Sequence, residues 1–501
     1  MTEDNRIRNI VIVGGGTAGW MAAASFARFL KPLGCHIELV ESEEIGSIGV
    51  GEATVPPVMD FIRVLGIDEN DLIRKTQATF KLGIQFQDWL RPGHAWSHPI
   101  GQIGFDIDGV PFGAYWLKER LAGRAAPLEA YSLAAQAAEH GKFMRPIVAP
   151  NSPLERINYA LHFDAVLFAR YMRSFAEARG VVRTEGRVVS VVQRPNDGLV
   201  EKLVLESGKT IEGDLFIDCS GFQAILIEGA LKTGYEDWKQ WLPCDRAAAV
   251  PVRQTRAPAT YTLSKALDAG WQWRIPLQHR TGNGYVYCSE FSSDEAALET
   301  LKAHGDGEEM NDPLLINFSS GRRKQFWSKN VVALGLASGF LESLESTSIH
   351  LIQKGLMLLL RFFPDRNFEP ADRDRYNTQL AAEFERVRDF LLLHYTTSER
   401  EDTPFWRHCK NLPLTDSLKE RLELFRGYGR ILGEDSDLFP AQSWLSLLTS
   451  QGVTPRSHDP LADTLDPAVV TATLENIKNV VAECAKAMPT HQEFIAKNCA
   501  V

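Results

Sequence analysis

The sequence has few of the features that mark membrane, nucleic-acid-binding or secreted proteins. No apolar run approaches the roughly 20 residues that cross a bilayer, and the stretch at residues 356–360 is far shorter. Basic residues number 54 against 64 acidic ones, and they are scattered, so no basic patch favours a phosphate backbone or an anionic membrane. The acidic start, Met1-Thr-Glu-Asp-Asn5, contains no apolar secretory segment. We therefore expect a cytoplasmic protein that binds neither nucleic acid nor membranes.

Cysteine is also scarce, and its spacing predicts no cross-links. The chain has no Cys-x-x-Cys pair, and its seven cysteines are widely separated: Cys35, Cys219, Cys244, Cys288, Cys409, Cys484 and Cys499. An odd number of scattered cysteines predicts reduced thiols, with neither a zinc site nor a disulfide framework. Apolar residues make up 44% and charged residues 24% of the 501 residues, which excludes disordered, collagenous and coiled-coil chains. We expect one large composite domain or two to three closely associated ones.

The chain opens with the pattern of a dinucleotide-binding unit. A buried strand at residues 10–13 leads into a glycine turn, a helix from residue 20 to about 30 and a second strand at 37–40. The turn fits Gly-x-Gly-x-x-Gly and contains Gly14, Gly16, Thr17, Ala18 and Gly19. Glycine permits the tight turn and lets a pyrophosphate approach the helix N-terminus. Glu41 ends the second strand, where a carboxylate can accept hydrogen bonds from a ribose. The motif favours dinucleotide binding and not the alternative, a glycine turn that binds no ligand. It does not distinguish FAD from NAD.

Later segments predict how the rest of the chain is organised. We expect strands at residues 187–192, 202–206, 214–218 and 330–334, an antiparallel sheet within 248–291, and helices from about residue 348 to the end. The apolar strand that stops at Cys219-Ser-Gly221 resembles the second nucleotide-side segment of FAD-dependent monooxygenases, which favours FAD. The nucleotide-binding segments are separated in the sequence, so the domains are expected to be interleaved.

We therefore predict an α/β fold in which a Rossmann-like FAD-binding module of the FAD-monooxygenase type is combined with an interleaved sheet and a mainly helical C-terminal substrate module. The predicted FAD-binding module comprises residues 1–90, 154–235 and 320–365. The predicted substrate module comprises residues 91–153, 236–319 and 366–501.

Taken by pattern alone, the charged and aromatic residues that stand out have ordinary structural explanations. Apolar residues alternate through 80–86, which predicts one half-buried strand with Lys81 on its solvated face. Trp271 and Trp273 lie on one face of a strand and would pack there. Glu345 precedes a helix from about 348 to 363, where an acid favours the helix dipole.

Four motifs in the same order as in a known family change this interpretation. They are Gly49-Val-Gly-Glu-Ala-Thr-Val-Pro56, Phe80-Lys-Leu-Gly-Ile-Gln-Phe86, Trp271-Gln-Trp-Arg-Ile-Pro276 and Gly335-Leu-Ala-Ser-Gly-Phe-Leu-Glu-Ser-Leu-Glu-Ser-Thr347. The chain resembles the flavin-dependent halogenases, the tryptophan-halogenase family, from residue 10 to about 410. Gly335-Leu336 stands where FAD hydroxylases usually have Gly-Asp.

The resemblance implies an enzyme with two compartments. FADH2 from a separate flavin reductase would react with O2 and a halide ion, bromide or chloride, to give hypohalous acid, which crosses an internal passage to an aromatic substrate. Lys81 would hydrogen-bond that acid or capture the halogen as a haloamine, and sequence does not decide between these. Glu345 would face the lysine, where it polarises the oxidant or takes the ring proton. Trp271 and Trp273 would fill the space between flavin and substrate.

The resemblance also assigns binding residues. The backbone amides of Thr347 and Ser348 open the expected helix, and we predict the halide there. The family often has proline at the position of Ser343 and glycine at that of Ser348, so the shape of this loop is left open. Further cofactor contacts are assigned to Gly51, Ala53, Val188, Leu336 and Ile349.

The substrate and the assembly are less defined by sequence. His98-Pro-Ile100 resembles the family's His-Pro-Phe beside the aromatic substrate, although a lone histidine can equally be structural. Trp444-Leu445 aligns loosely with a Tyr-Tyr pair that holds free tryptophan in the family, so we predict an indole-like or larger aromatic substrate over free tryptophan. Alternatives are an FAD monooxygenase that hydroxylates with NAD(P)H and a flavin-binding protein without chemistry. The preferred halide and homodimer formation stay open.

Overall fold

The computed structural model describes residues 4–44, 51–431, 433 and 437–499. Its first sheet has six strands in the order β20-β21-β12-β1-β2-β8. All neighbours pair in parallel except β20 with β21. The strands are β1 (Asn9–Val13), β2 (His36–Glu41), β8 (Val182–Glu185), β12 (Leu215–Asp218), β20 (Trp327–Ser328) and β21 (Val331–Ala333). The expected strands at 10–13, 37–40, 214–218 and 330–334 are thus confirmed within a residue or two.

Helix α1 (Thr17–Phe29) connects β1 to β2 and begins three residues earlier than the sequence predicted. Gly16 has extended backbone, at φ −75° and ψ −172°, so the helix starts directly after it. Apolar residues around Trp20 and Met21 are buried against the sheet, and α6 (Ala165–Glu177) packs alongside α1. This arrangement places the N-terminus of α1 at the carboxyl end of β1, where dinucleotides bind in such sheets.

A second, mostly antiparallel sheet has seven strands in the order β18-β14-β17-β16-β15-β5-β6. Only β15 and β5 pair in parallel among these described strands. The bounds are β5 (Gly83–Gln87), β6 (Ala95–Pro99), β14 (Arg246–Val252), β15 (Tyr261–Leu267), β16 (Gly270–Pro276), β17 (Thr281–Tyr287) and β18 (Leu314–Asn317). The antiparallel sheet expected within 248–291 is confirmed.

Three small sheets complete the strands. They are β3-β7-β4, formed by Gly51–Ala53, Ala160–Asp164 and Thr79–Lys81; β11-β10-β9, formed by Thr210–Glu212, Val200–Leu205 and Val188–Gln193; and β13-β19-β22, formed by Tyr235–Asp237, Gly321–Arg323 and Gly339–Phe340. All seven cysteines are free, as the sequence predicted.

The interpretation of residues 80–86 from the pattern alone, as one half-buried strand with a solvated lysine, does not hold. The chain leaves the small sheet at the end of β4 and enters the seven-stranded sheet at the start of β5. Leu82 lies between the two strands, where its backbone N–H bonds to Thr260 and its carbonyl accepts from Ile100. Both faces of this segment are covered, so Lys81 is 1% exposed rather than solvated.

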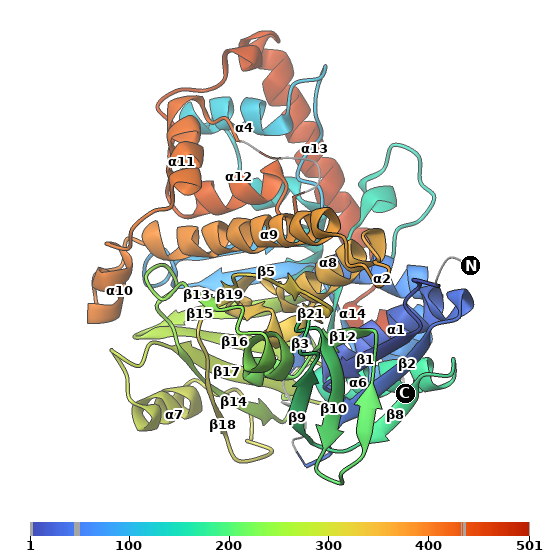
Figure 1. Ribbon diagram of the computed structural model, residues 1–501. Coiled ribbons are helices and arrows are strands. Elements are labelled where there is room, and N and C mark those ends of the chain that lie inside the picture. The colour runs from blue at the N-terminus through green and yellow to red at the C-terminus, as the bar shows by residue number, and fades with distance from the viewer. Residues whose placement is uncertain (1–3, 45–50, 432, 434–436, 500–501) are drawn as a thin grey trace.

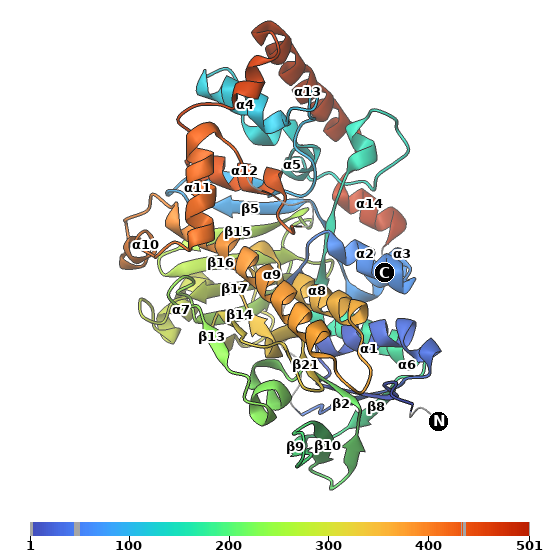
Figure 2. The ribbon, with the colours of Figure 1, turned by 45° about the horizontal axis from the view of Figure 1, so that its top comes forward.

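In Figure 1, helix α9 (Pro370–Thr396) lies between the sheets and a group of outer helices. In Figure 2 it lies in front of the strands, beside α8. Its C-terminal half is almost wholly buried. The outer helices are α4 (Phe112–Leu121), α5 (Leu133–Glu139), α11 (Asp416–Tyr428), α12 (Ala441–Ser450) and α13 (Pro467–Ala487). The others are α2 (Pro57–Leu65), α3 (Glu69–Thr76), α7 (Asp294–Ala303), α8 (Ser348–Arg361), α10 (Pro404–Cys409) and α14 (His491–Asn498).

This arrangement matches the predicted α/β class with a mainly helical C-terminal part. Within the described ranges, no helix combines the length and apolar character needed to cross a membrane. The division into two modules at the residues given above stays a prediction.

Candidate functional site

Lys81 ends β4, and its ammonium group is enclosed by the protein. Its Nζ donates to the backbone carbonyl of Thr54 and to the hydroxyl of Ser346, each at 2.8 Å. Burial lowers the pKa of Lys81 to about 7, although the nearby charge of Glu345 acts in the opposite direction. The side chain can therefore exist as a neutral amine near neutral pH.

Glu345 lies directly beside the lysine's hydroxyl partner. It ends a 3₁₀ turn at Ser343–Glu345, and Ser346 follows in the left-handed region at φ 63°. Its Oε2 lies 2.8 Å from Nδ1 of His98, and its Oε1 lies 3.0 Å from Nε2 of His394. Burial alone would raise the pKa of Glu345, but the two histidines outweigh it and lower the pKa to about 2. The carboxylate is thus ionised and held from both sides.

His394 was not identified from sequence. It lies on α9 within the apolar run that begins at Leu391, and a single buried histidine in such a run was the only available signal. Its Nδ1 donates to the carbonyl of Phe390 at 3.0 Å, in the helix's own preceding turn. Its ring packs against Phe86, Trp89, Trp96 and Phe390. These contacts fix the ring that faces Glu345.

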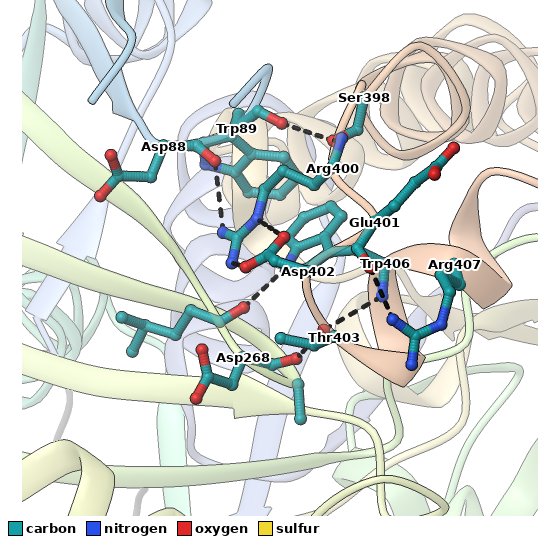
Figure 3. A network of polar contacts seen from close by, with 12 residues as sticks. Asp88, Trp89, Asp268, Ser398, Arg400, Glu401, Asp402, Thr403, Trp406 and Arg407 are labelled. Carbon is teal, nitrogen blue, oxygen red and sulfur yellow. Dashed lines mark hydrogen bonds and ion pairs between the residues drawn. The ribbon is translucent and has the colours of Figure 1, made fainter. Parts of the chain in front are cut away.

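The segment after α9 anchors this end of the helix to the seven-stranded sheet (Figure 3). Ser398 donates to the carbonyl of Trp89 at 2.6 Å, and Arg400 donates to the carbonyl of Asp88 at 3.3 Å. Arg400 also pairs with Asp402 and lies 4.8 Å from the ring centroid of Trp406. These contacts hold the C-terminal end of α9 in place, and with it His394.

Trp271 and Trp273 share one face of β16, as predicted, with ring centroids 6.1 Å apart. The indole N–H of Trp271 donates to Glu342 Oε2 at 2.9 Å, and the hydroxyl of Tyr395 donates to the same oxygen at 2.8 Å. Burial raises the pKa of Glu342 to about 7 despite these two donors. Glu342 and Tyr395 were missed by sequence reasoning, because residues far apart in the chain form the contact. A buried carboxyl thus orients the first tryptophan of the wall.

The predicted halide position lies at the start of α8. Thr347 is the N-cap residue, no side chain caps the helix, and the Thr347 hydroxyl is buried without a hydrogen-bond partner among the described residues. The first N–H groups of a helix have no partner within the helix. Ser343 and Ser348, the two positions that differ from the family pattern, hydrogen-bond to each other at 2.6 Å. The halide assignment to Thr347 and Ser348 stays a prediction.

The glycine turn has the shape that a pyrophosphate requires. Gly14 has φ +110°, and a Cβ there would lie 2.2 Å from the carbonyl oxygen of Cys219. A Cβ on Gly19 would lie 1.8 Å from Gly14's own carbonyl oxygen. At Gly16, by contrast, a Cβ would meet nothing within 4 Å, so the backbone is open where a ligand would approach. Thr17 and Ala18 form the uncapped first turn of α1, and these residues fit the diphosphate of FAD.

The other predicted cofactor residues come from several elements. Glu41 forms ion pairs with Arg183 and Arg173, at 2.5 and 3.5 Å. A Cβ on Gly335 would lie 2.6 Å from Ala18, which brings Leu336 to the glycine turn. The remaining four are Val188, which packs in the cluster at the ends of β1 and β2; Gly51 and Ala53 in β3; and Ile349 in α8. Residues 49–50 of the first motif lie outside the described residues.

The predicted substrate residues lie in two places. Trp444 packs edge-on against Phe390, whose ring stacks on Phe439 at 3.8 Å, and His98 lies 5.6 Å from Phe390. His98 was expected beside the substrate and is also the partner of Glu345. Ile100 instead lines a separate hollow with residues that include Phe105 and Tyr131. Phe390 and Phe439 carried no sequence signal.

The assembled groups can perform acid–base and nucleophilic chemistry behind an aromatic wall. Within the described ranges, no group of three or more potential metal ligands is suitably placed for a metal ion. The site combines an amine, a carboxylate and two imidazoles.

Comparison with known proteins identifies the family. A family model described as tryptophan halogenase matches residues 9–467. Tryptophan 6-halogenase ThaL of Streptomyces albogriseolus is 35% identical over 495 residues, covering 91% of this chain and 92% of that protein. Xcc4156, a flavin-dependent halogenase from Xanthomonas campestris, is 44% identical with a TM-score of 0.95, and the match covers 99% of both chains. BrvH, a flavin-dependent halogenase from Brevundimonas sp. BAL3, is 46% identical with the same TM-score and coverage. The resemblance inferred from four motifs is thereby confirmed, and this chain belongs to the tryptophan halogenase family of flavin-dependent enzymes.

Proposed function

We propose that this enzyme uses FADH2, O2 and bromide or chloride to halogenate an indole-like aromatic substrate, and that a separate flavin reductase supplies the FADH2. One observation carries the proposal. Lys81 ends strand β4 and Glu345 ends a distant 3₁₀ turn, yet both side chains are buried near Ser346. The lysine donates to the serine hydroxyl, and Glu345 is the residue before that serine. A hydroxylase site has no need of a buried amine beside a carboxylate.

The flavin would be held by the glycine turn and the start of α1, with Leu336 beside them. When bound, reduced flavin supplies with O2 the oxidising power that converts halide to hypohalous acid. The indole of Trp271 would fill the space between the flavin and the substrate. It is held by a hydrogen bond to Glu342, which Tyr395 also contacts. The substrate ring is thus separated from the flavin, and only a small oxidant can pass.

Lys81 can then act on hypohalous acid as a nucleophile. Because burial lowers the pKa of Lys81 to about 7, the neutral amine is available at neutral pH. The lysine nitrogen forms a bond to the halogen while the oxygen–halogen bond breaks, and the departing hydroxide takes the amine's proton to leave as water. A ring carbon of the substrate next attacks the halogen while the nitrogen–halogen bond breaks. The lysine nitrogen takes a proton from water to become the neutral amine again, and the ring loses its own proton. A protonated lysine would instead donate a hydrogen bond to the intact acid.

The aromatic cluster favours a flat, largely apolar substrate. Phe390, Phe439 and Trp444 contribute ring faces and edges near His98. Trp444 cannot provide the hydroxyl that a tyrosine would offer to an amino acid's ammonium or carboxylate. We therefore propose an indole-like or larger aromatic compound over free tryptophan.

A reconstituted assay tests the function. The protein, FAD, a flavin reductase, NADH and bromide or chloride are incubated with indole and with tryptophan, and products are analysed by mass spectrometry. Halogen isotope patterns are expected; a gain of one oxygen would support hydroxylation instead, and hydrogen peroxide alone would support a protein without substrate chemistry. Lys81→Ala is expected to retain FAD binding and lose halogenated product. Lys302→Ala, on the exposed face of α7, controls for the loss of a lysine.

A further inference from the structure

Aromatic halogenation leaves a proton on the substrate ring that some group must accept. The family resemblance suggests Glu345 as the acceptor, but its surroundings make it less suited to accept the ring proton. One carboxylate oxygen is occupied by His98 at 2.8 Å, the other faces His394 at 3.0 Å, and the residue is 1% exposed. Both histidines also lower the pKa of Glu345, so it is a weaker base than an ordinary carboxylate.

The contacts of His394 suggest that it stabilises the charge of Glu345. Its Nδ1 faces the carbonyl of Phe390, which can only accept, and its Nε2 faces the carboxylate. The carbonyl accepts the Nδ1 hydrogen, whereas Nε2 lies at ion-pair distance from the carboxylate without forming a hydrogen bond. This close contact helps to lower the pKa of Glu345 and so favours the ionised carboxylate.

His98 has a different pattern. Its Nδ1 must carry hydrogen to bond Glu345, which leaves the lone pair of a neutral ring on Nε2. Among the residues that the structure describes, Nε2 has no hydrogen-bond partner, and the side chain is 10% exposed. The ring lies 5.6 and 6.3 Å from the centroids of Phe390 and Phe439. The second ring nitrogen is thus free of protein partners, in a ring that lies beside the aromatic cluster.

We propose that His98 Nε2 accepts the proton from the substrate ring, that Glu345 positions the imidazole through Nδ1, and that His394 holds Glu345. This deepens the proposed halogenation and depends on it. When the ring carbon has bonded the halogen, the C–H bond breaks, its electron pair restores the aromatic ring, and the proton moves to Nε2. The resulting imidazolium is stabilised by the Glu345 carboxylate and later releases the proton to water. A carboxylate that orients a histidine base in this way is a recurrent catalytic arrangement.

His98→Asn tests the assignment. The asparagine side-chain nitrogen can occupy the position of Nδ1 and still donate to Glu345, but no basic nitrogen remains at the position of Nε2. Turnover is measured separately with ordinary indole and with indole deuterated at its ring carbons. We expect kcat to fall by roughly 10²- to 10⁴-fold, with a smaller change in KM, and a primary isotope effect on kcat to appear because deprotonation becomes limiting.

His350→Asn is the matched control. His350 is also 8% exposed and hydrogen-bonds a buried carboxylate, Glu383, at 2.8 Å, so it tests the loss of a buried His–Glu pair as such. That variant is expected to show no primary isotope effect. If His98→Asn fails to fold, as judged by circular dichroism and FAD binding, His98→Gln replaces it, since that amide is equally unable to accept the proton.

The outcomes separate this inference from the function on which it depends. A His98 variant that raises KM but shows neither a fall in kcat nor an isotope effect would reduce His98 to a substrate contact and overturn the inference alone. A wild-type enzyme that halogenates no aromatic compound would overturn the proposed function and the inference together. A fall in kcat accompanied by an isotope effect in the His98 variant only would support both.

Discussion

Replacing Lys81 by methionine should make the protein less sensitive to pH. The two side chains have similar length, but methionine cannot be protonated. The unfolded chain holds the lysine proton up to the ordinary pKa of 10.5, whereas the folded protein gives it up above about 7. Between those values the unfolded chain binds more protons, so this group makes the free energy of unfolding rise with pH by about 1.4 kcal/mol per pH unit.

The size of the effect follows from that window. Lys81 contributes a destabilisation of up to about 5 kcal/mol below pH 7, which disappears by about pH 10.5. The two hydrogen bonds made by Nζ offset part of it, by roughly 1–3 kcal/mol each. The difference in unfolding free energy between wild type and Lys81→Met should therefore change by about 2–3 kcal/mol from about pH 7.5 to about pH 9.5, in favour of wild type at the higher pH.

Urea unfolding of both proteins at several pH values measures this difference, and other titrating groups cancel because they are common to both. Lys302→Met, on the exposed face of α7, is the control for the substitution itself. A difference between wild type and Lys81→Met that is constant across the range would show that the amine titrates as it does in water. The nucleophilic role of Lys81 near neutral pH would then lose its physical basis.

Two further predictions concern the cofactor turn and the tryptophan wall. Gly14→Ala should prevent stable folding, because a Cβ would lie 2.2 Å from the Cys219 carbonyl oxygen, whereas Gly16→Ala should keep the thermal stability of the FAD-free protein and weaken FAD binding by roughly tenfold or more. Equal FAD affinity in Gly16→Ala and wild type, measured by fluorescence titration, would place the flavin elsewhere. Trp271→Phe removes one of two donors to the buried Glu342 carboxyl and should lower stability by about 1–3 kcal/mol. An unchanged urea midpoint in that variant would mean that the indole N–H contributes nothing there.

Local patterns in the sequence were sufficient for four of the six strands of the first sheet. The glycine spacing at 14–19 requires a tight turn between a strand and a helix, and the structure has both. The strands β1, β2, β12 and β21 are short and apolar, so their limits could be read to within a residue or two. The edge strands β8 and β20 were not predicted. The alternation of Trp271 and Trp273 likewise follows from the two-residue period of a strand.

The segment around Lys81 shows where such patterns fail. A two-residue alternation predicts one exposed face, but here a second sheet and the loop that contains Ser346 cover that face as well. Nothing local in residues 80–86 indicates that the chain changes sheets at Leu82. Glu345 is hundreds of residues away from His98 in the sequence and dozens of residues away from His394. Only the folded chain brings the three side chains together.

Helix α9 joins the two halves of the site through neighbouring residues. His394 faces Glu345, the partner of the proposed proton acceptor His98. The next residue, Tyr395, hydrogen-bonds Glu342, which also accepts from Trp271. A shift or rotation of this helix would therefore disturb Trp271 and the carboxylate at once. Engineering a roomier pocket by altering α9 thus risks leakage of oxidant along with loss of rate, and changes confined to α12 around Trp444 offer a safer route to new substrates.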